Sequence, residues 1–377
     1  MDQTYSQQFL LPQNGPQQTM AQQPSRPTQP PAQNQALATG GQYRTGVGIS
    51  ISQPLLQNRG GGQLKTEFNA LGFGVKQSQA QAAENQKTFL LQMAERFVDW
   101  ALAEEKEKIA TERLKAELEV KARISGPMAQ MDQARAEDAA LAAKAALALA
   151  ASARKATRAE LAMLAQSHAM NEESAQIDLY KKYPVPEAGQ AEAAAVKNSK
   201  VMAALNASRS QLASAGEGLS DKARPRLDLN LGAGVKGEDK EYGKSLSMDR
   251  NEWNASLVFI YPLGARSAAE DVRKNELEIT RLESEINAAK LELASQARML
   301  VTQISQMDQA MDIGFERAAA ARRRAAEEER EYFQGRGSLA MALLARDNED
   351  GARTALAENA ALRTKLKLRL DAVLDQL

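Results

Sequence analysis

Few residues of this sequence are spaced so that they could carry out chemistry. The 377 residues include no Cys and one His, His168, so a thiolate metal site, a multi-histidine metal site and a cysteine nucleophile are excluded. Gly232–Gly237 matches the dinucleotide-binding pattern G-x-G-x-x-G, but a helix must open at the third glycine and a polar segment follows here instead. Gly243–Ser245 ends like a phosphate-binding loop, but Glu238 stands where that loop needs glycine. We therefore expect no enzyme activity, no metal and no cofactor.

The charged residues do not indicate a nucleic-acid partner. The 48 Lys and Arg residues are balanced by 48 Asp and Glu residues, so the chain lacks the basic excess that binds phosphate backbones. Arg322–Arg324 and Glu327–Glu329 are spaced for i,i+4 ion pairs such as Arg323–Glu327. This pattern is typical of a solvated helix face, and electrostatic docking of a partner is the alternative interpretation.

Long helices are the elements that the composition favours. Aromatic residues make up only 5% of the chain, which indicates narrow cores. Gly and Pro are absent from residues 75–125, 128–183 and 265–313. Segments without the two poorest helix formers become helical at little cost. Helices of such length exceed those of ordinary globular domains and indicate coiled-coil packing.

One segment shows the apolar seam that such packing requires. Within residues 272–293 the apolar positions follow one another at steps of seven, three, four, three and four, and they are Val272, Ile279, Leu282, Ile286, Ala289 and Leu293. This is a heptad pattern, and it predicts a helix packed along a narrow stripe. A single exposed amphipathic helix is the alternative.

Two other segments change to the period of two that strands show. In Arg226–Lys236 and in Trp253–Tyr261 apolar side chains share one face, and a polar stretch, Gly237–Arg250, lies between them as a long loop. Strands of nine to eleven residues suit a membrane. Asp228 and Asn230 would then face a lumen, and the side chains facing lipid would be Leu229, Leu231, Leu257 and Phe259. An ordinary half-buried hairpin is the alternative.

Strands are the elements through which this chain could enter a membrane. The first 20 residues lack the basic start and apolar core of a signal peptide, and no run of about 20 apolar residues occurs anywhere. Val47–Ser52 is a third strand-like segment, at the end of a Pro-rich and Gln-rich stretch.

Two parts of the sequence repeat the same order of elements. Segments 48–55 and 256–263 both run from a strand into a Pro-Leu step before a long helical stretch. The turn at Gly126 lies 72 residues after Pro54, and the turn at Gly335 lies 73 residues after Pro262. This regularity is typical of a tandem duplication. Each helix would reach roughly 105 Å at 1.5 Å per residue, and equal lengths would bring both turns to the same height.

The sequence resembles the TolC-type outer membrane factors, the exit ducts of Gram-negative efflux pumps and type I secretion systems. The resemblance covers residues 43–377, and it is carried by Trp253–Leu263, Tyr332–Leu339, and Tyr183–Glu187 with the helix that follows. It implies a mainly α fold with a small antiparallel β portion, in which long coiled-coil-like helical hairpins and transmembrane β-strands form two tandem repeats. Three protomers would form one β-barrel and one α-helical tunnel.

The resemblance also implies location and partners. A homotrimer would sit in outer membrane lipid of a Gram-negative bacterium, extend into the periplasm, and bind a periplasmic adaptor (membrane fusion) protein and an inner-membrane transporter. The alternative is a non-transporting elongated helical scaffold or a degenerate paralogue. Family members begin with a signal peptide, one or two helices and a first strand, of which only the end could correspond to Thr4–Leu11, so we expect a truncated chain or a misassigned start.

A pore gate is assigned by the same resemblance. In the family a Tyr before the second turn donates a hydrogen bond to an Asp after the first turn, and Tyr332 and Asp132 occupy these positions. Met341 and Leu344 stand where some members carry acidic residues, which implies an apolar constriction; ordinary seam residues are the alternative. The turns that would dock the adaptor contain Gly126, Pro127, Gly335 and Gly337. The membrane strands and their anchors would include Pro54, Leu229, Leu231, Trp253, Leu257, Phe259, Tyr261 and Pro262.

Four parts of the chain follow from this interpretation. Residues 1–45 would be a Pro/Gln-rich disordered or external loop, and residues 46–183 a first repeat with a strand and a long helical hairpin. Residues 184–224 would form a linking helix. Residues 225–377 would be a second repeat with a strand pair and another long helical hairpin.

Overall fold

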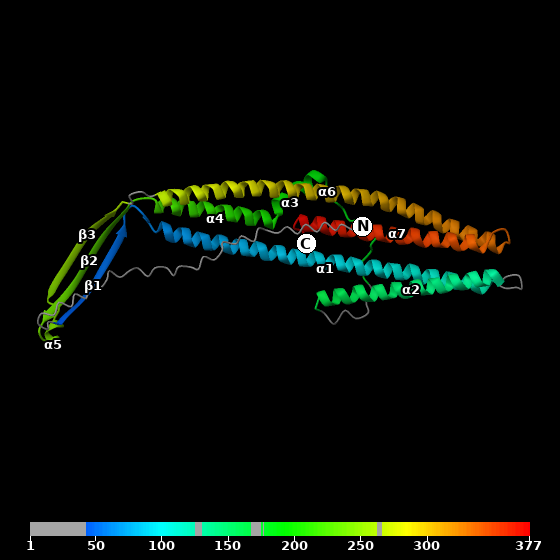
Figure 1. The fold of residues 1–377 in the computed structure, drawn as a ribbon, viewed down its shortest axis with the longest axis horizontal. Helices are drawn as coiled ribbons and strands as arrows, with labels where there is room; N and C mark the ends of the chain where they lie inside the picture. Colours follow the sequence, from blue (N-terminus) through cyan, green and yellow to red (C-terminus); the bar gives the residue numbers. More distant parts are fainter. Residues whose placement is uncertain (1–42, 125–129, 167–174, 176, 262–265) are drawn as a thin grey trace. The chain divides into compact units, whose positions relative to one another are not determined.

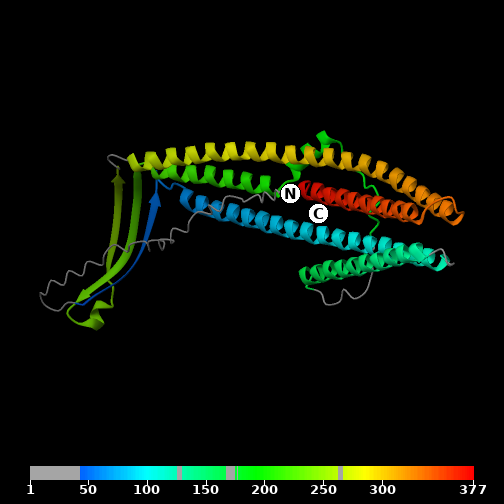
Figure 2. The ribbon, with the colours of Figure 1, turned by 45° about the vertical axis from the view of Figure 1, so that its right-hand side comes forward.

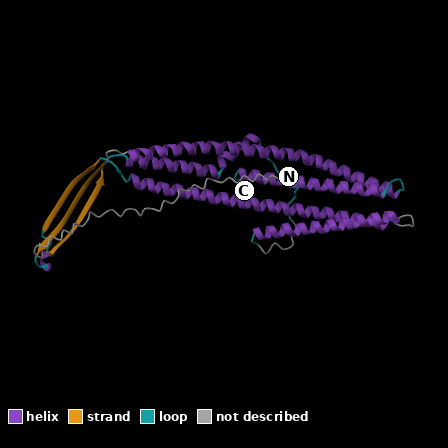
Figure 3. Cartoon of the chain, in the orientation of Figure 1, coloured by secondary structure: helices purple, strands orange, loops and turns teal. Residues whose placement is uncertain are grey.

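The computed structural model describes residues 43–124, 130–166, 175, 177–261 and 266–377, and these are mainly helical (Figure 3). The chain forms two compact units. Among the described residues, one contains Tyr43–Gln53 together with Leu229–Val258 and is built on strands; the other lies within Pro54–Asp228 and Phe259–Leu377 and is built on helices. None of the described helices combines the length and the apolar character needed to cross a membrane.

Three strands form one antiparallel sheet in the order β1-β2-β3. They are β1 (Tyr43–Pro54), β2 (Arg226–Asp239) and β3 (Arg250–Ile260). The predicted strands are therefore present and longer than expected. The loop predicted at 237–250 is shorter than expected, because β2 continues to Asp239 and β3 begins at Arg250; a short helix, α5 (Tyr242–Ser245), lies within it.

Two helical hairpins make up most of the other unit (Figure 1). The first pairs α1 (Gly62–Arg123) with α2 (Gln130–Leu164), and the second pairs α6 (Arg266–Phe333) with α7 (Leu339–Val373). The expectation of equal long helices is wrong, since α1 has 62 residues and α6 has 68. The first helix starts late because Gly60 and Gly61 have positive φ angles of 70° and 75°, which a right-handed helix does not accept.

The predicted linking helix is broken into two. α3 (Ala188–Asn198) and α4 (Lys200–Lys222) are separated by Ser199, whose ψ of 124° interrupts the helix. The Ser199 hydroxyl accepts a hydrogen bond from the Met202 N–H at 3.3 Å and caps α4. An expectation of one continuous helix in 184–224 is therefore wrong.

Two helices lie end to end in the middle of the helical unit. In Figures 1 and 2, α4 and α7 follow one another between α6 and α1. The junction is tied by the Asn198 amide, which donates to the Leu374 carbonyl at 3.4 Å, and by the Lys200 N–H, which donates to Asp375 at 2.8 Å. This arrangement buries α7 on several sides.

The heptad seam predicted for α6 is confirmed. Leu282, Ile286 and Ala289 are buried in one cluster with Met202 of α4, and Leu293 packs against it. The alternative of a single exposed amphipathic helix is therefore wrong for this segment.

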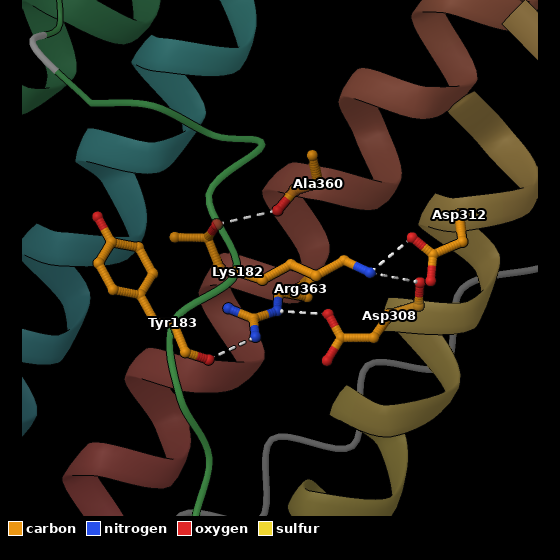
Figure 4. A network of polar contacts seen from close by, with 7 residues as sticks. Lys182, Tyr183, Asp308, Asp312, Ala360 and Arg363 are labelled. Atoms are coloured by element: carbon orange, nitrogen blue, oxygen red, sulfur yellow. Dashed lines mark hydrogen bonds and ion pairs between the residues drawn. The ribbon is translucent and has the colours of Figure 1, made fainter. Parts of the chain in front are cut away.

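A buried arginine fixes the non-helical segment that precedes α3 (Figure 4). The side chain of Arg363 on α7 is 1% exposed. Its Nε lies 3.0 Å from Asp308 Oδ1 on α6, and its Nη2 donates to the Tyr183 carbonyl at 2.7 Å. Lys182 donates to Asp312 at 2.7 Å. The chain between the first hairpin and α3 is thus fastened to both helices of the second hairpin.

Candidate functional site

The ends of the long helices meet in one apolar cluster. Its buried members come from α1, the residue after α1, α2 and α7, and are Val120, Ile124, Ala136 and Leu339. Tyr332 and Phe333, the last two residues of α6, pack against it. Side chains from both hairpins therefore share one small core at this tip.

Two glycines make the turn between α6 and α7 possible. Gly335 has a φ of 75°, in the left-handed region that favours glycine. A Cβ on Gly337 would lie 3.0 Å from the Tyr332 backbone nitrogen and 3.2 Å from the Glu331 carbonyl carbon, so a side chain there would be crowded against the end of α6. Ser338 then caps α7 by accepting from the Met341 N–H at 3.4 Å. The first turn, with Gly126 and Pro127, lies outside the described residues.

Tyr332 and Asp132 are in contact. The Tyr332 hydroxyl donates to Asp132 Oδ2 at 3.2 Å and so joins α6 of the second hairpin to α2 of the first. Partial burial raises the pKa of Tyr332, and the negative charge of Asp132 and this hydrogen bond raise it further. The hydroxyl therefore stays protonated, and remains a donor, across the neutral range.

Arg123 supports this contact, and the sequence analysis missed it. Its guanidinium lies over the Phe333 ring at 3.5 Å from the ring centroid, and its Nη1 lies 3.2 Å from Glu329. The Phe333 ring in turn meets the Tyr332 ring edge-on at 5.1 Å. The available signal was a basic residue in the last turn of a long helix, which also suits the helix dipole.

The solvated-face interpretation of 322–329 is wrong for Glu329. This carboxylate is mostly buried and pairs with both Arg123 and Arg346. The i,i+4 pair of that segment joins Arg324 to Glu328 at 3.8 Å, and Glu327 pairs with Arg330. Local spacing identified the paired charges but not the partner from α1, which is about 200 residues away.

Met341 and Leu344 lie outside the core of this chain. Their exposed fractions are 42% and 50%, whereas Leu339 and Ala342 beside them on α7 are buried. Within one chain they are not seam residues of the α6–α7 hairpin. The apolar side chains of Met341 and Leu344 are therefore exposed on the surface of this chain, just after the turn between α6 and α7.

One face of the sheet is polar. Lys236 of β2 pairs with Glu252 of β3, and Arg44 of β1 pairs with Glu238 of β2 at 2.8 Å. Asp228, which was expected to face a lumen, is buried and paired with Arg226 at 2.5 Å. Alternation along the strands places all these side chains on the same side.

The other face of the sheet is apolar and exposed in this chain. Its exposed members are Val47, Ile49, Ile51, Leu231, Trp253, Leu257 and Phe259. The Leu229 side chain is half-buried, and Tyr261 just beyond β3 is exposed and stacks on Phe259 with ring centroids 6.5 Å apart. Pro54 ends β1, and Pro262 lies outside the described residues. The face that sequence alternation predicted as apolar is thus a continuous strip over all three strands.

The glycines that matched a nucleotide-binding pattern have a packing role. Gly234 lies inside β2, and a Cβ there would lie 3.1 Å from the Gly48 Cα of β1. Close strand approach therefore accounts for Gly234. Gly237 is needed for another reason, because a Cβ there would collide with the Ser245 carbonyl of α5. Among the described residues no group of three or more acidic, His or Cys side chains could hold a metal ion, and His168 lies outside them.

The fold is that of outer membrane channel proteins, as the resemblance implied. No family model matches the chain, and no curated protein matches it. Among solved structures, the open-state MtrE outer membrane channel of Neisseria gonorrhoeae is 17% identical with a TM-score of 0.68, over 89% of this chain and 80% of that one. The outer membrane protein VceC of Vibrio cholerae is 11% identical with a TM-score of 0.67, over 89% of this chain and 87% of its own. The Campylobacter jejuni CmeC outer membrane channel is 13% identical with a TM-score of 0.65, over 89% and 78%.

Proposed function

We propose that this protein is one protomer of a trimeric outer membrane exit duct, which passes substrates from the periplasm to the exterior as part of a tripartite efflux pump or a type I secretion system. The observation that carries the proposal is a sheet with one polar face and one exposed apolar face, in a chain with the fold of outer membrane channels. Its partners would be two further copies, a periplasmic adaptor and an inner-membrane transporter.

The two-faced sheet supports a place in a barrel wall. An exposed apolar strip suits lipid, and ion pairs such as Arg44–Glu238 suit a water-filled lumen. In the described sheet β1 and β3 are the outer strands. Strand edges are not tolerated in lipid and the smallest single-chain barrel has about eight strands, so further copies would have to complete the wall.

An exposed apolar stripe on α1 supports the same assembly. Four side chains at helical spacing are exposed near the start of this helix: Leu64, Phe68, Leu71 and Val75. They lie on one face because residues spaced by three or four share a side of a helix. A neighbouring protomer would cover this face in a helical tunnel.

The helical tip would serve as the gate and the docking site. Tyr332 and Asp132 would form a latch that holds the two hairpins together in the closed duct, and Met341 and Leu344 would give the constriction an apolar lining. The turns containing Gly126, Pro127, Gly335 and Gly337 would meet the adaptor. The contact between the two latch residues supports this assignment.

The orientation of the sheet can be tested with one pair of substitutions. Leu231→Arg places a charge on the apolar face and should cost roughly 2–4 kcal/mol of stability in a bilayer if the residue lies near the midplane. Asn230→Arg, one residue away on the polar face, is the control and should cost much less. Urea unfolding from lipid vesicles measures both. Environment-sensitive labels that report position 228 in lipid and position 231 in water would contradict the orientation.

The proposal as a whole is tested by location, assembly and current. Heat-modifiable trimers in the outer membrane fraction and discrete single-channel currents in planar bilayers are the expected results. The second candidate is an elongated helical scaffold that does not transport, which the length of α1 and α6 would also permit. An elongated coiled coil recovered without membranes, and silent in bilayers, would reject the duct in favour of that scaffold.

A further inference from the structure

A ladder of ion pairs joins the two hairpins along α1 and α7. From one ion pair to the next, the residue number rises along α1 and falls by nearly the same amount along α7. All the pairs therefore belong to one antiparallel register of the two helices. The pairs, from the middle of α1 toward the tip, are Glu95–Arg369, Asp99–Lys365, Lys106–Glu358, Glu112–Arg353 and Arg113–Asp350. Most of these side chains are partly exposed, where ion pairs contribute little each. The ladder therefore fixes the alignment of α1 with α7 and adds little to the free energy of their contact.

The tipward end of the ladder differs because charged atoms of Arg113, Glu117 and Asp350 are buried there. We call Arg113 and Glu117 of α1, with Asp350 of α7, the buried charge cluster; Asp347 of α7, at its edge, is exposed. The Glu117 residue is 1% exposed, and one of its carboxylate oxygens, Oε2, has no hydrogen-bond partner. Asp350 Oδ2 is also buried without a hydrogen bond, and its ion pair with Arg113 Nε spans 3.4 Å. Arg113 is shared, because it also pairs with Asp347.

Charges from the surrounding helices leave this region acidic. The basic groups of α1 and α7 around it are Arg113, Arg123, Arg346 and Arg353, and the acidic groups are Glu112, Glu117, Asp347, Glu349 and Asp350. From α6, Glu329 pairs with Arg346 and Arg123. Its negative charge offsets part of the stabilisation that Arg346 gives to ionised Glu117. On the α2 side of the cluster, two ion pairs join α2 to α1: Arg154 with Glu107 at 2.5 Å and Glu137 with Lys121 at 3.0 Å. Each pair is neutral, so neither changes the net charge of the region. Six carboxylates against four arginines favour proton uptake.

We propose that the buried charge cluster is a proton-sensitive contact that holds the two hairpins together when its carboxylates are protonated and lets them part as they ionise. An ionised carboxylate that is buried without a hydrogen bond is penalised, and parting the helices would return it to water. The ionised form therefore favours parted hairpins and the protonated form favours closed ones. The inference rests on the proposed function in one respect only, namely that parting the hairpins opens the duct.

The direction of the effect follows from where the proton binds more tightly. Burial raises the pKa of Asp350 from its ordinary 3.8 to about 6, against the attraction of Arg113, and burial also raises the pKa of Glu117. The closed contact is therefore stabilised below this pH and loses that stabilisation as the pH rises through about 6. One pKa unit corresponds to a tenfold change in an equilibrium. Asp350 alone should change the ratio of closed to parted hairpins by about tenfold between pH 8 and pH 5.

Spin labels across the contact test this directly. The chain has no Cys, so two introduced cysteines are labelled without background. Lys115 on α1 and Asn348 on α7 are exposed and flank the cluster. Double electron–electron resonance on labelled chains diluted into unlabelled assemblies reports the distance within one chain. We expect the ratio of the short to the long distance to rise about tenfold from pH 8 to pH 5.

Three variants make the result specific. Asp350→Asn should favour the short distance and remove most of the pH response, and Glu117→Gln should remove a smaller part of it; circular dichroism establishes that each variant folds. Asp371→Asn is the control, because its carboxylate pairs with Lys367 on the same helix, and it should keep the full pH response. A wild-type distance distribution that is the same at pH 5 and pH 8 would overturn the proposal, as would a full response in Asp350→Asn. Planar bilayer currents at both pH values separate the two ideas: a pH-dependent distance without any current would leave the contact standing and remove the duct.

Discussion

The helices α2 and α7 occupy the same place in their hairpins and have very different surroundings. Each has 35 residues, each follows a longer helix, and each is rich in alanine. Thirteen residues of α7 are buried along its whole length, whereas four are buried in α2. Leu141, Leu149 and Met163 of α2 are exposed. Similar composition has therefore produced a core helix in one case and a surface helix in the other.

The difference comes from the number of neighbours. α7 lies between α6 and α1 and meets α4 at its end (Figure 2), while α2 packs mainly on α1. A helix gains hydrophobic stabilisation only from the faces that other elements cover. Substitutions on α7 should therefore affect stability much more than equivalent ones on α2. The two helices can be compared residue by residue.

The largest difference should come from leucines. Leu370 of α7 is fully buried among Leu300 and Ile304 of α6, so Leu370→Ala removes packed atoms and leaves a cavity that costs about 2–5 kcal/mol. Leu149 of α2 is 73% exposed, and Leu149→Ala should change stability by no more than about 0.5 kcal/mol. Chemical unfolding of the detergent-solubilised protein measures both. Equal losses would mean that α2 is covered in the assembled protein, which would itself locate a partner surface.

A smaller difference is expected from arginines. Arg363→Ala of α7 removes a buried guanidinium from Asp308 and from the Tyr183 carbonyl, and should cost about 2–3 kcal/mol, because Asp308 retains some access to water. Arg154→Ala of α2 breaks a partly exposed pair with Glu107 and should cost less than about 1 kcal/mol. Thermal unfolding at matched pH is the measurement. A cost for Arg154→Ala equal to that for Arg363→Ala would contradict the assignment of α2 as a surface helix.

The contact between the hairpins should have a modest energy and a visible effect on current. Tyr332→Phe and Asp132→Ala each remove the same hydrogen bond, worth about 0.5–1.5 kcal/mol at a half-buried site. Each should raise conductance in planar bilayers, and the double variant should add little to either, because the two residues share one interaction. Unchanged conductance in both single variants would remove the latch assignment while leaving the duct proposal intact.

The smallest effects should be of opposite sign at two glycines. Gly335 has a positive φ of 75°, so Gly335→Ala should cost about 1 kcal/mol. Gly351 lies in the interior of α7 with open space around it, so Gly351→Ala should stabilise the helix by about 0.5–1 kcal/mol. Thermal unfolding resolves the sign. A stabilised Gly335→Ala variant would show that the turn does not need the left-handed backbone.

Local rules recovered much of the fold from the amino-acid sequence. The distribution of Gly and Pro predicted the turn before α7, because these residues change the cost of helix directly at their own positions. Alternation predicted the apolar face of the strands, since side chains of a strand point to opposite sides in turn. The heptad spacing predicted the buried seam of α6. The Tyr332–Asp132 contact followed from the resemblance to a family and not from any spacing.

The tertiary structure alone decided which surfaces are covered. The burial of α7 and the exposure of α2 depend on neighbours that lie far away in the sequence, and two alanine-rich segments carry no local sign of them. The partners of Glu329 were missed for the same reason, because Arg123 comes from another hairpin. The break at Ser199 was also missed. A serine can lie inside a helix or cap the start of a new one, and the sequence around Ser199 does not show which of the two occurs. Such features depend on how long helices align in space, and a shift of one residue in that alignment would change every pairing between them.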